Sequence, residues 1–331
     1  MRTGRIATCV LFAALAGAET HRYMPERYSL EFSPYMEPAL RINSGDVVVT
    51  TCVDSDGYDE NGKRVAPHWN ALTGPFYIQG ADSGDSIEVE LLRIRLNRKS
   101  GFGSNAVSEA AAPPQYLLNN RHPFRIVRWT FDLESMTATT DFSPRLKGYR
   151  VPLRPFPGCI GTAPAWREAQ SSITSDAHGG NVDYNRLVEG TKVFLPVNVK
   201  GAYLFIGDGH AAQGDGETSG GAIETTLAVE FRVTLHKKEA IPSMRAESDR
   251  FIMALGMGRP LEDAFQKATA NMLSWLTKDF GMAPEDAHIL LGTAARYDVA
   301  SVPNPRFTMA CRLDKKVVAE AGGKRQSSLH P

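Results

Sequence analysis

The sequence predicts a mainly β fold with a helical segment near the C-terminus, an α+β protein. Apolar residues recur with a period of two in several segments before residue 240, as in strands that have one buried face. A helical period appears only after Pro260. The chain has 331 residues, 42% of them hydrophobic, which is enough to bury one large core or the cores of two tightly joined domains.

Strands are expected in two stretches of the chain. In the first stretch, residues 46–53 are rich in β-branched side chains, and residues 86–96 alternate apolar and charged side chains. Residues 99–114 are rich in Gly, Ser, Ala and Pro, which predicts a long surface loop that can serve as a lid. In the second stretch, strands are expected at residues 126–133, 192–199, 202–206 and 222–235.

Two helices are expected after these strands. The first begins at Pro260 and ends before Gly281, and the second runs from Pro284 to about residue 295. The apolar face of the first helix is interpreted as a packing surface and is formed by Leu261, Phe265, Ala268, Met272 and Trp275 or Leu276.

The chain is therefore expected to divide into five segments. These are a signal peptide (1–18), an N-terminal β-rich half (19–125), a β-rich half that carries the metal and catalytic loops (126–240), C-terminal helices and a strand packed on the core (241–315), and a flexible tail (316–331).

The first 18 residues have the composition of a signal peptide. Arg2 and Arg5 precede an apolar run at residues 6–15, and small residues follow up to a cleavage site after Ala18. The alternative is an amphipathic or buried N-terminal helix. With cleavage, the mature protein is expected to be secreted or periplasmic. No membrane span is expected, because no stretch reaches the ~20 apolar residues that spanning requires.

The charge balance indicates which partners to expect, and the number of cysteines indicates whether disulfides form. Lys plus Arg and Asp plus Glu number 37 each, so no nucleic-acid partner is expected, whereas a small neutral substrate fits. The sequence is also compatible with a homo-oligomer.

Three cysteines follow the signal segment: Cys52, Cys159 and Cys311. Their odd number argues against a disulfide framework, although one bridge can still form. We expect Cys159 to be a small buried group; the alternative, a nucleophile, lacks a neighbour in sequence that would lower its pKa.

Residues 207–217 concentrate groups that bind metals, in the run Gly-Asp-Gly-His-Ala-Ala-Gln-Gly-Asp-Gly-Glu. Glycine lets the backbone bend sharply, so several side chains of one loop can face a common centre. Carboxylate and imidazole groups bind divalent metals. Zinc is favoured, with manganese or calcium as alternatives, because calcium sites rarely use a histidine such as His210. A further alternative is a hairpin in which Asp208 and Asp215 only accept hydrogen bonds from turn amides.

Several stretches, in this order, resemble the acetamidase/formamidase family: residues 70–77, 156–164, 177–183, 195–199, 207–217 and 222–224. The resemblance spans roughly residues 28–300, and the run at 207–217 is its most specific part. It implies a β-sandwich or β-barrel architecture, a bound divalent metal and the hydrolysis of linear amides such as formamide and acetamide to ammonia and a carboxylate. The export signal and Cys159 depart from the family pattern.

A mechanism follows as a hypothesis. A metal lowers the pKa of bound water toward ~7, and a nearby carboxylate takes the proton and returns it to the departing nitrogen. Glu217 is assigned as this general base and acid because it ends the loop. The metal ligands assigned are His178, Asp208, His210 and Asp215, and the substrate-binding residues assigned are Asn181, Asp54 and His68.

The competing function is an exported, non-catalytic, metal-containing protein that binds a ligand in the same fold. The carboxylate of Glu217 beside the ligand candidates favours an enzyme, since a structural metal site needs no additional base. A third possibility is the same chemistry on a larger amide, which the loop at 99–114 would accommodate.

Overall fold

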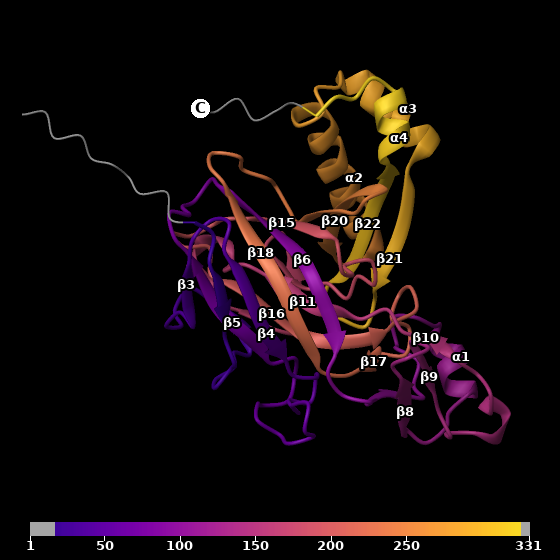
Figure 1. The fold of residues 1–331 in the computed structure, drawn as a ribbon. Coiled ribbons are helices and arrows are strands. Elements are labelled where there is room, and N and C mark those ends of the chain that lie inside the picture. Colours follow the sequence, from indigo (N-terminus) through magenta and orange to yellow (C-terminus); the bar gives the residue numbers. More distant parts are fainter. Residues whose placement is uncertain (1–16, 326–331) are drawn as a thin grey trace, which may run out of the picture.

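The computed structural model describes residues 17–325 and consists of two packed β-sheets with a layer of helices at one end (Figure 1). The first sheet has nine strands, in the order β1 (Thr20–Arg22), β4 (Val47–Cys52), β18 (Leu227–His236), β6 (Ser86–Leu96), β15 (Lys192–Pro196), β19 (Arg245–Glu247), β20 (Phe251–Gly258), β22 (Phe307–Asp314) and β21 (Arg296–Ser301). The expected signal peptide, apart from its last two residues, lies outside the described residues.

The second sheet has eleven strands. Nine follow the order β10 (Val151–Pro152), β9 (Thr137–Thr139), β8 (Ile126–Asp132), β7 (Ser100–Ser104), β17 (Ile223–Glu224), β16 (Leu204–Ala212), β11 (Phe156–Gly161), β14 (Gly179–Asn181) and β13 (Ser175–Asp176). β5 (Leu72–Ile78) also pairs with β16, and β3 (Leu40–Ile42) pairs with β5. A separate pair is formed by β2 (Glu31–Phe32) and β12 (Gln170–Ser171).

The mainly β fold expected from the sequence is confirmed, and its architecture is a sandwich. The path of the second sheet ends at β10 and β13, so the described strands do not close into a barrel. One apolar cluster contains buried residues of both sheets, among them Val89 and Phe231 from the first sheet and Ile160 and Leu204 from the second. The two sheets therefore share one core between their facing surfaces.

The alternating segments form strands close to the expected positions. The segment 86–96 is β6, which pairs with β18 from Ser86 opposite His236 to Leu96 opposite Leu227. The expected strand at 222–235 is two strands, since the chain passes from the second sheet to the first at Thr225 and Thr226. Strands of the two β-rich segments thus interleave in both sheets, because each long strand finds its partner far away in sequence.

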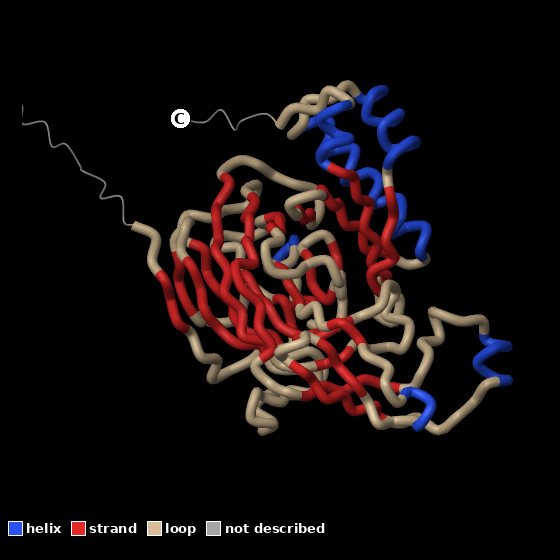
Figure 2. Tube along the Cα trace, turned by 45° about the vertical axis from the view of Figure 1, so that its right-hand side comes forward, coloured by secondary structure: helices blue, strands red, loops and turns tan. Residues whose placement is uncertain are grey.

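The C-terminal segment adds an edge to the first sheet and covers it with helices. α2 (Leu261–Lys278) packs against β20 and β22, with Met272 and Trp275 buried, and α3 (Pro284–Ala294) joins the same apolar cluster. Figure 2 shows these helices grouped at one end of the strands. Both helices occur where the sequence predicts them.

Two expectations about flexible segments were wrong in part. Residues 316–320, expected in a flexible tail, are part of α4 (Lys315–Glu320), because Val318 is buried in the helical cluster and Asp314 caps the first turn. The expected loop at 99–114 begins with β7, which pairs with β8 and β17. The remainder leads into α1 (Pro114–Asn119) on a projecting part of the second sheet (Figure 1).

Two 3₁₀ turns complete the described structure, at Pro144–Leu146 and Ala165–Arg167. Among the described residues, no helix is both long and apolar enough to cross a membrane.

We predict that Gly256→Ala destabilises the protein by about 1–3 kcal/mol through overpacking. A Cβ at Gly256 in β20 would lie 2.2 Å from the backbone nitrogen of Ala268 and 2.3 Å from the carbonyl oxygen of Ala264, both in α2. The matched control is Gly292→Ala in α3, where a Cβ meets nothing within 4 Å, and stability is expected to rise by ~0.5–1 kcal/mol. Denaturant unfolding measures both. An equal effect of the two substitutions would contradict the close packing of α2 on β20.

Candidate functional site

β16 carries two of the predicted site residues into the interior. Asp208 and His210 were expected in a loop, but the strand continues to Ala212 because β11 pairs with it on one side and β5 and β17 on the other. Across the ladder, His210 lies opposite Glu224 of β17. Nε2 of His210 is 3.4 Å from Oδ2 of Asp208 and 3.3 Å from Oε2 of Glu224.

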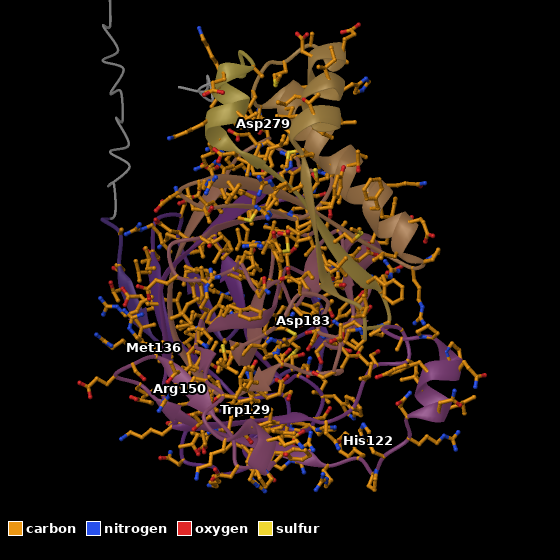
Figure 3. All side chains as sticks on the ribbon, turned by 90° about the vertical axis from the view of Figure 1, so that its right-hand side faces the viewer. His122, Trp129, Met136, Arg150, Asp183 and Asp279 are labelled. Atoms are coloured by element: carbon orange, nitrogen blue, oxygen red, sulfur yellow. The ribbon has the colours of Figure 1, made fainter. Side chains whose placement is uncertain are left out.

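Five ionisable side chains meet here, and we refer to them as the acidic cluster: Asp183, Asp208, His210, Glu217 and Glu224. Ligand atoms of Asp183, Asp208 and His210 lie within 4.8 Å of one another, as do those of His210, Glu217 and Glu224. None of the five residues is more than 6% exposed. Figure 3 shows Asp183 in the interior, near the C-terminal strands.

Burial perturbs the ionisation of the cluster. It raises the pKa of Asp208 to about 7, and burial together with the carboxylate of Asp183 raises the pKa of Glu217 well above its usual range. Burial opposes a charge on His210 too, but the carboxylates of Glu224 and Asp208 outweigh it and raise the imidazole pKa. Four carboxyl groups and one imidazole in a buried space carry excess negative charge, which protons or a cation must neutralise.

Unpartnered atoms in the cluster fit a cation. Oδ1 of Asp183, Oδ1 of Asp208 and Oε2 of Glu224 are buried and have no hydrogen-bond partner among the described residues. Such atoms are rare in folded proteins, where a missing ion or water often explains them. Together with Nε2 of His210 they offer three oxygens and one nitrogen, a set that suits zinc or manganese. The cluster can therefore hold a divalent metal.

Gln213 fixes the orientation of His210. Its amide nitrogen lies 2.7 Å from the carbonyl oxygen of Asp183 and 3.1 Å from that of Ala300, and its Oε1 lies 3.1 Å from Nδ1 of His210. Because the amide nitrogen donates to the two carbonyls, Oε1 accepts a hydrogen bond from the N–H group at Nδ1. With Nδ1 protonated, Nε2 is the nitrogen that becomes a metal ligand when it loses its proton, and it faces the carboxylates of Asp208 and Glu224.

The backbone around the cluster is strained. Asp183, Asp208 and Glu217 have φ values of 43°, 57° and 49°, a region that residues other than glycine rarely occupy and that is enriched at functional sites. Gly158 of β11 leaves the space that two carboxylates fill, since a Cβ there would lie 2.6 Å from Oδ1 of Asp183 and from Oδ2 of Asp208.

Two of the predicted substrate-binding residues lie beside the cluster. Oδ1 of Asn181 accepts hydrogen bonds from Asn70 at 3.2 Å and from the thiol of Cys159 at 2.9 Å, and Asn70 also donates to Asp208. Asp54 is buried and paired with Arg98 at 2.7 Å. Burial raises the pKa of Asp54, with the nearby Glu224 carboxylate adding to the effect.

Three predicted residues lie outside the cluster. Asp215 is exposed and accepts a hydrogen bond from Asn185 at 2.8 Å, because the loop after β16 turns its side chain outward. His178 is buried against Phe32, and burial lowers its pKa to about 4. His68 is partly exposed and lies 2.6 Å from Asp56.

The sequence prediction missed Asp183 and Glu224 as members of the cluster, and Asn70, Gln213, Ser301 and Asn304 as its partners. Asp183 and Glu224 stand in stretches that carry the family resemblance, which was the available signal. The side chain of Glu224 reaches the cluster through its register opposite His210, and a single sequence does not reveal that register.

The three described cysteines are buried and free: Cys52, Cys159 and Cys311. The expectation that Cys159 is a buried group is confirmed. Burial and the carboxylates of Asp208 and Asp183 raise the pKa of the Cys159 thiol well above its usual value. Cys159 therefore stays protonated and is a poor nucleophile.

The fold and the acidic cluster define the class of protein as a β-sandwich with a buried polar centre of the kind that enzymes use. The acetamidase/formamidase family model matches residues 27–170 and 165–311. A putative formamidase of Schizosaccharomyces pombe is 27% identical, and the match covers 60% of this chain and 62% of that relative. The formamidase of Methylophilus methylotrophus is 26% identical over 67% of this chain and 70% of its own.

A solved acetamidase structure from Yersinia enterocolitica superposes with a TM-score of 0.80 and 29% identity, and the match covers 92% of this chain and 94% of that one. The chain belongs to the acetamidase/formamidase family, as the sequence predicted, and the class of enzyme that this family defines is an amidase.

We predict that Gly158→Ala lowers metal affinity at least ~10-fold, because its Cβ would displace two carboxylates of the cluster. The control is Gly214→Ala in the loop after β16, where a Cβ meets nothing within 4 Å. Metal affinity is measured by chelator competition on protein checked for folding by circular dichroism. Wild-type affinity in folded Gly158→Ala would show that the metal binds elsewhere.

Proposed function

We propose that the protein is a metal-dependent hydrolase of linear amides such as formamide and acetamide, which it cleaves to ammonia and a carboxylate. Family membership supports amide hydrolysis. The observation that supports the metal dependence is the buried acidic cluster, in which ligand atoms of carboxylates lie within 4.8 Å of a ligand atom of His210 and several carboxylate oxygens lack a partner among the described residues. Zinc is the proposed ion because the donor set combines an imidazole with carboxylates.

In this proposal, four residues of the acidic cluster hold the metal: Asp183, Asp208, His210 and Glu224. The metal, when bound, lowers the pKa of a water molecule and polarises the amide carbonyl. The proposed set replaces His178 and Asp215 of the sequence prediction by Asp183 and Glu224, since the latter two reach the cluster.

Glu217 acts as the general base and acid. One of its oxygens accepts a hydrogen bond from Ser301 at 2.8 Å, and its carboxyl group lies within reach of His210 and Glu224. It accepts the proton of the attacking water and returns it to the amide nitrogen, so that ammonia leaves as a neutral molecule. Asn181 is proposed to orient the amide group, because its side chain lies at the wall of the cluster beside Asp208.

Two substitutions distinguish the proposed general base from a proposed metal ligand. Glu217→Gln is expected to lower kcat by ~10²–10⁴-fold and to keep the metal, because an amide cannot take the proton. His210→Ala is expected to lose both activity and metal. The control is Asp215→Asn, whose side chain is exposed and outside the cluster, and which should retain activity and metal. Ammonia release and metal content measure both properties.

The same assay distinguishes the amidase from the ligand-binding alternative. Wild-type protein is expected to release ammonia from formamide or acetamide, to stop after chelation and to resume when metal is restored. No release from these or from larger amides after metal is restored would favour the ligand-binding alternative. Near-full activity in Glu217→Gln would refute its role as base.

We also propose that residues 1–18 are an export signal and that the mature protein is secreted or periplasmic. The basic, apolar and small-residue order of the segment supports this proposal. The backbone nitrogen of Glu19 lies 2.9 Å from Oδ1 of the buried Asp46, so a new amino terminus there would be neutralised. Mass spectrometry of exported protein is expected to find Glu19 as the first residue. Protein retained inside the cell with residues 1–18 attached would contradict export.

A further inference from the structure

We infer that Ser301 and Asn304 are positioning residues of the site, which hold the carboxylates of Glu217 and Asp183 in the orientation that hydrolysis requires. This inference rests on the proposed function, in which Glu217 is the general base and Asp183 is a metal ligand. Ser301 ends β21, and Asn304 lies in the turn between β21 and β22. Neither residue lies in the stretches that carry the family resemblance.

The direction of each hydrogen bond follows from the donors available. The amide nitrogen of Asn304 faces three acceptors: Oδ2 of Asp183, the carbonyl oxygen of Asn181 at 3.2 Å and Oγ of Ser301 at 3.0 Å. An amide nitrogen only donates, and its two N–H groups are shared among these three acceptors. Ser301 therefore accepts at Oγ and keeps its own proton for a carboxylate.

The proton of Ser301 goes to Glu217. Its Oγ lies 2.8 Å from Oε2 of Glu217 and 3.3 Å from Oδ2 of Asp183, so the nearer carboxylate is the better acceptor. One donor chain thus runs from Asn304 through Ser301 to Glu217, and a second bond from Asn304 fixes Asp183. With one oxygen of each carboxyl group engaged, its rotation is restricted.

The turn itself is fixed from two sides. The nitrogen of Gly216 donates to the carbonyl oxygen of Val299 at 2.7 Å, and the nitrogen of Val302 donates to that of Gly216 at 3.1 Å, so β21 is bridged to the loop that carries Glu217. On the other side, Arg306 pairs with Asp176 of β13.

A second connection lies earlier in the same strand, β21. Asp298 of β21 accepts hydrogen bonds from Tyr184 at 2.8 Å and from Arg186 at 2.7 Å. Tyr184 directly follows Asp183 in the chain. The C-terminal segment therefore contacts the side chain of the residue next to Asp183 and the backbone of the residue next to Glu217. Asn304 itself is flanked by Pro303 and Pro305, which restrict its backbone.

The experiment compares Ser301→Ala with Ser301→Thr, Asn304→Ala and the control Thr308→Val. Thr308 is a buried hydroxyl residue of the same segment, and its Oγ1 has no hydrogen-bond partner among the described residues, so its loss should leave kcat and metal affinity unchanged. Kinetics on formamide and acetamide, metal affinity by chelator competition and thermal unfolding are measured for each variant.

Ser301→Ala is expected to lower kcat ~10–100-fold, to change KM less than about three-fold and to retain the metal, because it frees the proposed base. Ser301→Thr keeps a hydroxyl and should restore most of kcat. Asn304→Ala frees a proposed ligand and should lower metal affinity ~10-fold or more.

The outcomes separate this inference from the proposed function. If the wild-type protein releases no ammonia, the proposed function fails, while weaker metal binding in folded Asn304→Ala still supports the positioning of Asp183. If the wild-type protein is active and both alanine variants match Thr308→Val in kcat and metal affinity, the inference is overturned. Equal losses in Ser301→Ala and Ser301→Thr would also overturn the role of the hydroxyl.

Discussion

The structure depends on one constraint, the burial of four carboxyl groups and one imidazole in a single space. Separating such groups from water is costly unless their charges are compensated. The protein surrounds them with rigid elements: the central strand β16, its neighbours β11 and β17, and the turn after β21. Strained backbone at Asp183, Asp208 and Glu217 persists because these elements determine their positions. A metal-free cluster is compensated only by protons, which agrees with the raised pKa of Asp208 and Glu217.

The sandwich supplies the rigidity. β16 contributes Leu204 and Ile206 to the apolar core between the sheets and, a few residues later, Asp208 and His210 to the cluster. The same strand thus anchors the site in the core and presents its polar groups. The helices on the first sheet lie outside the cluster, but they cover β20 and β22, which support β21 and its terminal Ser301. Packing of an apolar helix face is in this way connected to the orientation of a carboxylate.

The spacing of apolar residues in the sequence predicted the strands and helices that have one buried face. Period-two alternation located β6 and β18, and helical spacing located α2, because each pattern follows directly from which face is buried. The density of acidic and histidine residues after residue 206 indicated a site, and Asp208 and His210 do meet. Local density does not specify where a side chain points, so Asp215 was grouped with them although its loop turns it to solvent. Glu224 reaches the cluster through strand register, and Ser301 lies at the end of β21, far along the chain from Glu217. A single sequence reveals neither of these contacts, although the family resemblance includes Glu224.

The proposed division between ligands and base follows from which carboxylate oxygens already have partners. Among the described residues, Asp183 and Asp208 each keep a buried oxygen without a hydrogen-bond partner, and Oε2 of Glu224 has only the imidazole of His210 beside it, at 3.3 Å, whereas Ser301 engages Glu217. In the proposed set, a bound metal would complete the first three, because each would gain a partner for an oxygen whose burial otherwise costs free energy. Glu217 gains less from ligation, and a carboxylate held near the metal without binding it is what a general base requires. Chain order alone suggested this role for Glu217, and the hydrogen bond from Ser301 supplies a physical reason for it.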